Sequence, residues 1–446
     1  MNKLDTALVT AALKQACFQI IEDPDYADVV LINTCSVREH AEQKVLSNLG
    51  YLKHKKVSKP DLVVGVIGCM AQRLGNELLE QGNCDIVVGP AQIPQIVDYV
   101  RKALEHKRPI IAVTERIRTC DPENPQLEDF ESIFDSDDKQ IPGQAFVRAM
   151  RGCNNFCTYC IVPYVRGPEV SRPPKLIVEQ AKRLSDEGVK LITLLGQTVN
   201  SYEYKQGDKT YCLADIFEMT SQIKGVEWIR FVTNYPSEKY FSQICQAMRD
   251  LPKVCNYLHM PAQSGSDTIL KAMNRHYTRD QYLDLLQKAR DIVPNIAIAG
   301  DFIVGFPNES EDDFEQTVEL AKKAQYKNCF VFKYSPRPGT ASDKRLDDNI
   351  PDNVKKRRNT ELLAVQEKIS DKISSQFLDK TMKVLVEGLS KKPHLNKAQN
   401  QNHPQLIART ADDWIVVFNG PETLAGSFCE VKINKTSPLT LFGKLL

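Results

Sequence analysis

The chain has 446 residues, a length that predicts about two to four domains, each large enough to bury its own core. With 42% hydrophobic and 26% charged residues and no long apolar run, the composition excludes a disordered or membrane-spanning protein. The net charge of +1 excludes a general attraction to nucleic acid, so any RNA binding would need local basic patches. The N-terminus has no signal-peptide pattern and 13 cysteines are too sparse for a disulfide scaffold, so we expect a cytoplasmic protein with reduced thiols.

The first 120 residues alternate apolar runs with helical patterns. The runs DVVLINT, LVVGVIG, DIVVG and IIAV stand at 28–34, 62–68, 85–89 and 110–113. Continuous Val/Ile runs are typical of buried parallel strands that are covered by helices. They predict a doubly wound α/β domain with a parallel sheet over residues 1–120.

Two cysteines stand directly after two of these runs. Cys35 follows the first run and Cys69 follows the second. Ligands of open α/β sheets gather beyond the carboxyl ends of the strands, so we expect the two thiols to lie together and to share a metal site. The alternative is two structural cysteines buried in the core.

A second series of strands and helices follows an acidic, turn-rich stretch at 121–142, which we interpret as an inter-domain linker. The series covers 143–378 and includes helical patterns such as 175–187 and 279–291. Six βα units predict an open, partial β/α barrel, in which chemistry is expected at the C-terminal ends of the strands. The expected strands are 146–150, 191–195, 228–232, 257–260, 296–304 and 329–334.

The run RGCNNFCTYC follows the first barrel strand and places Cys153, Cys157 and Cys160 at C-x3-C-x2-C spacing. Three thiolates can hold three irons of a [4Fe–4S] cluster and leave the fourth iron without a protein ligand. An open iron can bind S-adenosylmethionine, whose sulfonium is then reductively cleaved to a radical. The alternative is a zinc site, but zinc prefers four ligands and no histidine stands near this run.

The last part of the chain predicts one long helix and a small β-barrel. Residues 353–378 are charged and strongly helical, and we expect the basic run 355–358 to form a solvated helix face. Five short strand patterns over 379–446 predict a small antiparallel barrel, a fold that often binds RNA but need not. Trp414 and Phe418 are expected in its core rather than stacked on a base. The expected strands are 383–387, 406–409, 414–418, 429–433 and 439–446.

Eight separated blocks, in order, resemble the methylthiotransferases, a family of radical S-adenosylmethionine enzymes. The likeness covers nearly the whole chain and is closest to the branch that acts on isopentenylated adenosine in tRNA. The blocks are NTCSVREHAEQKV at 33–45, GCMAQR at 68–73, MRGCNNFCTYCIVPYVRG at 150–167, LGQTVNSY at 195–202, HMPAQSGS at 259–266, MNRHYTR at 273–279, GDFIVGFP at 300–307 and YSPRPGTAS at 334–342.

This resemblance implies an N-terminal methylthiotransferase domain at 1–120, a radical-SAM partial barrel at 143–378 and a TRAM barrel at 379–446. It implies two [4Fe–4S] clusters: the barrel cluster cleaves S-adenosylmethionine, and the N-terminal cluster holds the sulfur that is delivered. The implied substrate is a tRNA anticodon stem-loop carrying isopentenyladenosine, whose C2 gains a methylthio group. An electron donor and a sulfur source for cluster repair are implied as partners, and we expect a monomer that does not bind membranes.

The resemblance also implies which cysteines bind the clusters. Cys153, Cys157 and Cys160 match the ligands of the barrel cluster, and Cys35 and Cys69 match two of the three N-terminal ligands. The third lies in a G-C-Q-M-N block at the end of the family's first strand, and this sequence begins in the tail of that block. We therefore expect the first strand and one ligand to be missing here. A start upstream of Met1 is favoured over a degenerate second cluster, because the other blocks are intact. Cys17 and Cys84 are poor substitutes.

Further residues are assigned by their place in the blocks, and each has a structural alternative. Polar or glycine residues after the barrel strands resemble the region that lines the S-adenosylmethionine site, although turn caps would look the same. Basic residues around the cysteine run could hold phosphates or be solvated charges. Pro168 and Ala408 depart from the family pattern and leave the local RNA contacts in doubt. The candidates are Gln197, Asn200, Gln263, Ser264, Ile303 and Gly305 for S-adenosylmethionine, and Arg148, Arg151, Arg166, Arg172 and Lys175 for phosphate.

Three other functions compete with this reading. Sister enzymes modify a ribosomal-protein aspartate or threonylcarbamoyl-adenosine in tRNA, and the segment after Cys35 disfavours both, the second less strongly. A non-catalytic tRNA-binding remnant would explain a two-cysteine N-terminal site.

Overall fold

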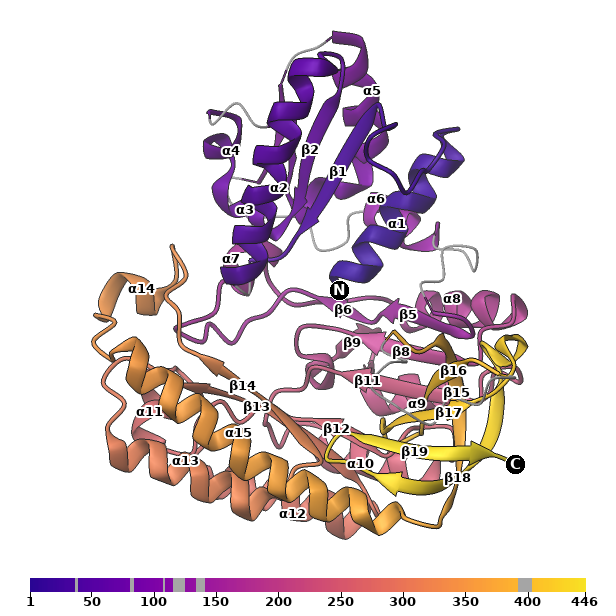
Figure 1. Ribbon diagram of the computed structural model, residues 1–446, viewed down its shortest axis with the longest axis vertical. Coiled ribbons are helices and arrows are strands. Elements are labelled where there is room, and N and C mark those ends of the chain that lie inside the picture. The colour runs from indigo at the N-terminus through magenta and orange to yellow at the C-terminus, as the bar shows by residue number, and fades with distance from the viewer. Residues whose placement is uncertain (37–38, 81–83, 107–108, 115–124, 134–140, 392–402) are drawn as a thin grey trace. The chain divides into compact units, whose positions relative to one another are not determined.

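The computed structural model describes residues 1–446 except 37–38, 81–83, 107–108, 115–124, 134–140 and 392–402 (Figure 1). The chain forms two compact units. Unit 1 comprises Met1–Asp138, Arg151–Phe156 and Cys160–Val170, and unit 2 comprises Lys139–Met150, Cys157–Tyr159 and Ser171–Leu446. Within the described ranges, no helix has the length and apolar character needed to cross a membrane.

Unit 1 contains a four-stranded, fully parallel sheet in the order β1-β2-β3-β4. Its strands are β1 (Val29–Thr34), β2 (Val63–Gly68), β3 (Ile86–Val88) and β4 (Ile110–Ala112). The parallel sheet predicted from the apolar runs is therefore confirmed. Its helices are α1 (Asn2–Gln15), α2 (Glu39–Ser58), α3 (Cys69–Leu74), α4 (Asn76–Glu80), η1 (Pro90–Gln95), α5 (Ile96–His106), α6 (Pro125–Ser132) and α7 (Val162–Arg166).

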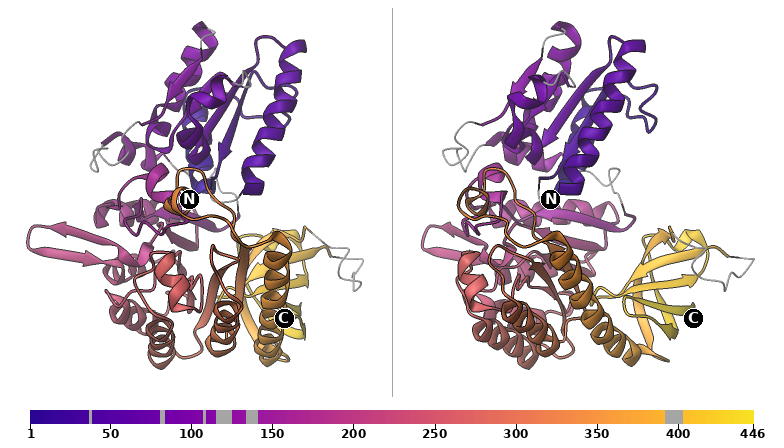
Figure 2. Two further views of the ribbon diagram at one scale, coloured as in Figure 1. Left: turned by 90° about the vertical axis from the view of Figure 1, so that its left-hand side faces the viewer. Right: turned by 60° about the vertical axis from the view of Figure 1, so that its left-hand side comes forward.

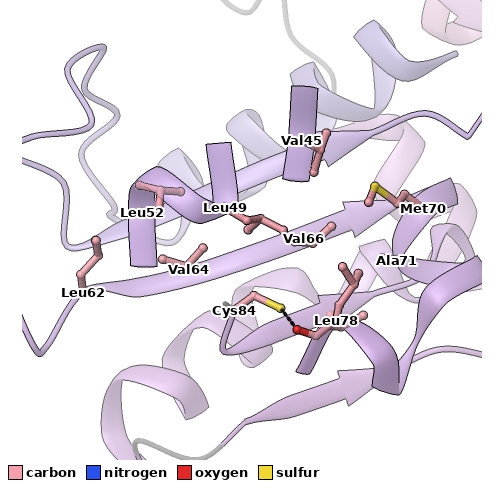
Figure 3. Close-up of a cluster of buried hydrophobic side chains, with 11 residues drawn as sticks. Val45, Leu49, Leu52, Leu62, Val64, Val66, Met70, Ala71, Leu78 and Cys84 are labelled. Atoms are coloured by element: carbon pink, nitrogen blue, oxygen red, sulfur yellow. Dashed lines mark hydrogen bonds between the residues drawn. The ribbon is translucent and has the colours of Figure 1, made fainter. Parts of the chain in front are cut away.

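The core of unit 1 forms where α2 covers the central strand β2. Val45, Leu49 and Leu52 recur at helical spacing and point toward the strand, as Figure 3 shows. All six residues of β2 are buried, including Val64 and Val66. Burial of each such side chain contributes about 1.5–3 kcal/mol to the stability of the fold. Because a shift of β2 would expose these side chains, their burial fixes the position of β2 in the sheet.

Unit 2 begins with six parallel strands that form the predicted partial barrel. Two three-stranded sheets, β11-β8-β5 and β12-β13-β14, are connected by a bridge between Ile229 and Val254. The strand ends lie within about two residues of the predicted ones. The strands are β5 (Gln144–Arg148), β8 (Leu191–Leu195), β11 (Trp228–Val232), β12 (Tyr257–His259), β13 (Ala297–Val304) and β14 (Asn328–Lys333), with the short β6 (Met150–Arg151) and β7 (Val170–Ser171) around the cysteine run.

Helices of unit 2 begin at caps that the sequence provides. Thr278 and Gln281 form a capping box at the start of α12, and Ser310 and Asp313 form one at the start of α13. Figure 1 shows α15 running along the outer side of β13 and β14. The helices are α8 (Pro174–Asp186), η4 (Val199–Ser201), α9 (Leu213–Ser221), α10 (Phe241–Asp250), α11 (Asp267–Ala272), α12 (Arg279–Ile292), α13 (Glu311–Ala324), α14 (Ala341–Arg345), α15 (Asp352–Ser374) and η5 (Ser375–Phe377).

An antiparallel hairpin, β9 (Glu203–Gln206) and β10 (Lys209–Cys212), projects from unit 2 and was not predicted (Figure 2). Its residues are mostly polar and exposed, so it has no apolar run. The tight turn at Gly207 was its only signal.

The prediction that residues 355–358 form a solvated helix face is wrong for two of the four residues. Lys355 and Arg358 are buried and paired with Asp348 and Glu309, while Lys356 and Arg357 are exposed. Positions three apart share one face of α15, so this spacing brings two cations onto the barrel. Arg358 Nη1 lies 2.8 Å from Glu309 Oε2, and both side chains are buried.

The C-terminal part of unit 2 is a closed five-stranded barrel in the order β15-β16-β17-β19-β18. Each neighbouring pair is antiparallel except β17 and β19, which pair in parallel. Trp414 and Phe418 are buried in its core, as predicted, and so is Ala408. The strands are β15 (Thr381–Leu389), β16 (Gln405–Arg409), β17 (Ile415–Asn419), β18 (Phe428–Thr436) and β19 (Thr440–Leu445), with the short turn η7 (Glu422–Leu424).

Candidate functional site

Cys35 and Cys69 lie side by side at the carboxyl edge of the unit 1 sheet. The register of β1 and β2 pairs Thr34 with Gly68, the two residues directly before the cysteines. Thr34 fixes this edge, since its hydroxyl donates to Ile67 O at 2.7 Å and accepts from the Met70 amide at 3.2 Å. The structure therefore brings these two predicted ligands together.

A buried arginine contacts one of these thiols. Arg166 Nε donates to Cys69 Sγ at 3.3 Å, and its Nη2 donates to Asp5 Oδ2 at 2.6 Å. Ile161 and Val165 pack against the same cysteine. Burial raises the pKa of the Cys69 thiol, and the Arg166 guanidinium partly offsets that rise.

The start of α1 lies at this same sheet edge. Asn33, at the end of β1, donates through Nδ2 to Asn2 O at 2.9 Å and to Thr6 Oγ1 at 2.8 Å. These two bonds hold the start of α1 against the end of β1.

The basic residues proposed for phosphate binding mostly lie inside the protein. Arg166 and Arg148 are buried, and buried Arg172 donates to Arg148 O at 2.7 Å and to Gln180 Oε1 at 2.9 Å. These three arginines are neither solvated charges nor open to a phosphate in this structure. Lys175 is exposed beside Glu179.

Cys153 and Cys160 belong to unit 1, and backbone geometry fixes the first of them. Gly152 has φ +75°, and a Cβ added to it would lie 1.7 Å from Pro168 O, so only glycine fits. The Cys153 amide donates to Gly167 O at 3.1 Å, and Asn155 Nδ2 donates to Cys153 Sγ at 3.5 Å. Cys153 is buried and Cys160 is partly exposed.

Cys157 belongs to unit 2, where a second buried arginine contacts it. Arg275 Nη1 donates to Cys157 Sγ at 3.5 Å, and its Nη2 donates to Pro261 O at 2.9 Å. The guanidinium lies over the rings of Tyr235 and Tyr277, at 4.4 and 5.0 Å from their centroids. We did not single out Arg275 from the sequence, although it stands in the MNRHYTR block.

The cysteines among the described residues are free thiols, and no group of three or more His, Cys, Asp or Glu side chains is placed there to hold a single metal ion. In a [4Fe–4S] cluster each thiolate binds a different iron. N–H donors to cysteine sulfur, as at Cys69, Cys153 and Cys157, are a recurrent means of tuning such clusters.

Five of the six residues predicted to contact S-adenosylmethionine follow barrel strands, and the sixth, Ile303, lies in β13. Asn200 donates to Tyr235 O at 2.7 Å and accepts from its amide at 2.8 Å, as a turn cap would. Gln263 has φ +70°, and Ser264 is buried beside Thr317. Of the other candidates, Gln197 follows β8, Ile303 lies in β13 and Gly305 follows β13. All six assignments to S-adenosylmethionine stay predictions.

Comparison with known proteins decides the family. Residues 147–321 match the Radical SAM superfamily, 1–89 the "Uncharacterized protein family UPF0004" and 377–446 the TRAM domain. The whole chain is 40% identical to a tRNA-2-methylthio-N(6)-dimethylallyladenosine synthase of Rhodopirellula baltica, over 93% of that protein. It is 37% identical to the synthase of Parabacteroides distasonis, again over 100% of the chain and 93% of the relative.

The chain belongs to the tRNA-2-methylthio-N(6)-dimethylallyladenosine synthase family. The fold agrees with a solved structure, the radical S-adenosylmethionine methyltransferase TsrM of Kitasatospora setae with cobalamin and a [4Fe–4S] cluster bound. That match has a TM-score of 0.53 at 13% identity and covers 76% of this chain and 73% of that one. Membership of the synthase family and of the radical SAM superfamily implies a [4Fe–4S] cluster and S-adenosylmethionine.

Proposed function

We propose that the chain is a radical S-adenosylmethionine methylthiotransferase that converts N6-isopentenyladenosine, next to the tRNA anticodon, to its 2-methylthio derivative. The proposal rests on three observations together. The whole chain matches the synthase, it contains a C-x3-C-x2-C run, and it has a second pair of thiols at the edge of a parallel sheet. The C2–H bond of adenine is unactivated, so its replacement needs radical chemistry and a separate source of sulfur.

The ligand sets follow from this function. We assign one [4Fe–4S] cluster to Cys153, Cys157 and Cys160, and a second cluster to a set that includes Cys35 and Cys69. When bound, the first cluster and S-adenosylmethionine supply the radical, the second cluster supplies sulfur, and another S-adenosylmethionine supplies the methyl group. The buried positions of three of these five thiols support the assignment, since burial keeps water and oxygen from a cluster.

The protein's own groups hold these thiols. Arg275 and Asn155 donate to the sulfurs of Cys157 and Cys153 and restrict their rotation. An external electron donor and a sulfur source complete the reaction. Reduced thiols throughout the described chain support a cytoplasmic location, and a monomer is the simplest assembly.

Two aromatic rings on the inner face of β14 are the proposed contact for the isopentenyl group. Cys329 of β14 points outward, because its Sγ lies 3.2 Å from Gln366 Oε1 of α15. Side chains alternate along a strand, so Phe330 and its partner two residues on, Phe332, point to the inner face. Phe330 is 53% exposed, and the two rings stack with centroids 6.3 Å apart.

Replacing Phe330 with alanine is therefore expected to weaken discrimination between isopentenylated and unmodified anticodon stem-loops by about five- to thirtyfold, or about 1–2 kcal/mol of apolar contact. The measurement is the ratio of dissociation constants for the two RNAs. Leu363→Ala is the control, since Leu363 is an exposed apolar residue on the outer helix α15. An unchanged ratio in the Phe330 variant would remove this residue from substrate recognition.

The function itself is tested in a bacterial strain that lacks its own tRNA methylthiotransferase. The chain is expressed there, the tRNA is digested and the nucleosides are analysed by mass spectrometry. We expect 2-methylthio-isopentenyladenosine to appear. A methylthio group on threonylcarbamoyl-adenosine or on a ribosomal-protein aspartate would move the chain to a sister activity. Unmodified isopentenyladenosine, also seen with an upstream-extended start, would support the non-catalytic remnant.

A further inference from the structure

Each of the two cysteine groups has one buried arginine in contact with a thiol, but the two arginines have different surroundings. Arg275, at Cys157, is surrounded by tyrosine rings and backbone carbonyls. Arg166, at Cys69, is bonded instead to a carboxylate, Asp5, whose side chain is also buried. The N-terminal thiol therefore faces an arginine–carboxylate pair, whereas no carboxylate is paired with the arginine at the barrel thiol among the residues that the structure describes.

We infer that Arg166, restrained by Asp5, is a positioning residue that sets the reduction potential of the N-terminal cluster. The inference rests on the proposed ligand set that includes Cys69. A thiolate-ligated cluster becomes more negative when reduced, so a buried cation at 3.3 Å from a ligand sulfur favours the reduced state. Solvent screens this interaction only weakly, because the side chains of Arg166 and Asp5 are 8% and 5% exposed.

Asp5 controls how much of the arginine's charge the cluster experiences. Its carboxylate holds Arg166 Nη2 at 2.6 Å while Nε points to the sulfur. The pair is close to neutral as seen from a distance, but its positive end faces Cys69. Removal of the cation and removal of the anion should therefore change the potential in opposite directions, which a loss of packing would not do.

The same segment of chain joins this arginine to the other cysteine group. Arg166 stands six residues after Cys160, and both belong to unit 1. Between them, Ile161 and Val165 pack against Cys69. A residue next to the radical-cluster run thus sets the environment of the sulfur-bearing site, which suits an enzyme whose two clusters act on one substrate.

The test uses the full chain, reconstituted anaerobically with iron and sulfide, and potentiometric titration followed by electron paramagnetic resonance. The barrel cluster is recognised because its signal changes on addition of S-adenosylmethionine. We expect Arg166→Gln to shift the midpoint potential of the other cluster to more negative values. Asp5→Asn should shift it to more positive values, and Arg166→Lys should lie between the wild type and the glutamine variant.

Arg275→Lys is the matched control, because it alters the equivalent contact at Cys157. It should shift only the cluster that responds to S-adenosylmethionine. Equal shifts of the same sign in the Arg166 and Asp5 variants, or no shift in either, would overturn the inference. If Arg166→Gln fails to bind iron, the sign of the Asp5→Asn shift still decides. A wild-type chain that binds only one cluster would instead contradict the proposed second ligand set.

Discussion

Replacing Cys157 with alanine is expected to abolish reductive cleavage of S-adenosylmethionine. Cys157 is the proposed ligand of one iron, and its buried thiol accepts a hydrogen bond from Arg275. Loss of a thiolate from a three-cysteine site leaves two irons without protein ligands. Iron content should therefore fall by about four atoms per chain, and 5′-deoxyadenosine should fall below detection.

The control for this experiment is Cys245→Ala. Cys245 is buried in α10, away from any strand end, so its replacement removes a similar volume without touching the proposed site. This variant should keep its iron and its 5′-deoxyadenosine yield. Retention of both in the Cys157 variant would exclude Cys157 as a ligand, whereas their loss in both variants would show only that buried cysteines matter for stability.

The strands that carry the site could be predicted because they are long apolar runs with polar ends. β8 and β11 match their predicted limits, and the positions of Cys35 and Cys69 at one sheet edge followed from their place after β1 and β2. In a parallel sheet, the carboxyl end of each strand reaches the same edge. The existence and direction of the strands are therefore enough to predict that these thiols lie together.

The residues around the thiols could not be predicted in the same way. Arg166 and its partner Asp5 are 161 residues apart in the sequence, and Arg275 and Cys157 are 118 residues apart. A single arginine carries no periodic signal, and its ordinary place is the surface. Its burial is decided by distant partners, which is why Arg148, Arg166 and Arg172 were wrongly expected to face phosphate or solvent.

Replacing Asp413 with asparagine is expected to lower the free energy of unfolding of unit 2 by about 3–5 kcal/mol at pH 7, because it leaves buried cations uncompensated. Asp413 lies 3.1 Å from Arg230, 3.6 Å from Lys327 and 3.0 Å from Arg409. Burial opposes its ionisation, but these three cations hold the pKa of its carboxyl below the ordinary value. The cluster ties the C-terminal barrel to strand β11 and to Lys327, the residue directly before strand β14 of the partial barrel.

The stability that is lost in the Asp413→Asn variant should become smaller as the pH rises above 7. Burial lowers the pKa of Lys327 to about 8, below that of an unfolded lysine, and Asp413 opposes that drop. Between about pH 8 and 10.5 the unfolded state therefore binds more protons, and stability rises with pH. Without Asp413 the pKa of Lys327 falls further, so the variant should recover part of its stability between pH 7 and 9.

The chain provides its own probe and control for this prediction. Its two tryptophans, Trp228 and Trp414, lie in barrel strand β11 and in the C-terminal core, so their fluorescence in urea reports both sides of the contact. Asp413 has φ +66°, a conformation that asparagine tolerates, so the substitution removes charge without backbone strain. Asp379→Asn is matched, since Asp379 has φ +63° but is exposed, and it should change stability by less than about 0.5 kcal/mol. Equal losses in the two variants, or no recovery at pH 9, would show that the charge cluster does not hold these barrels together.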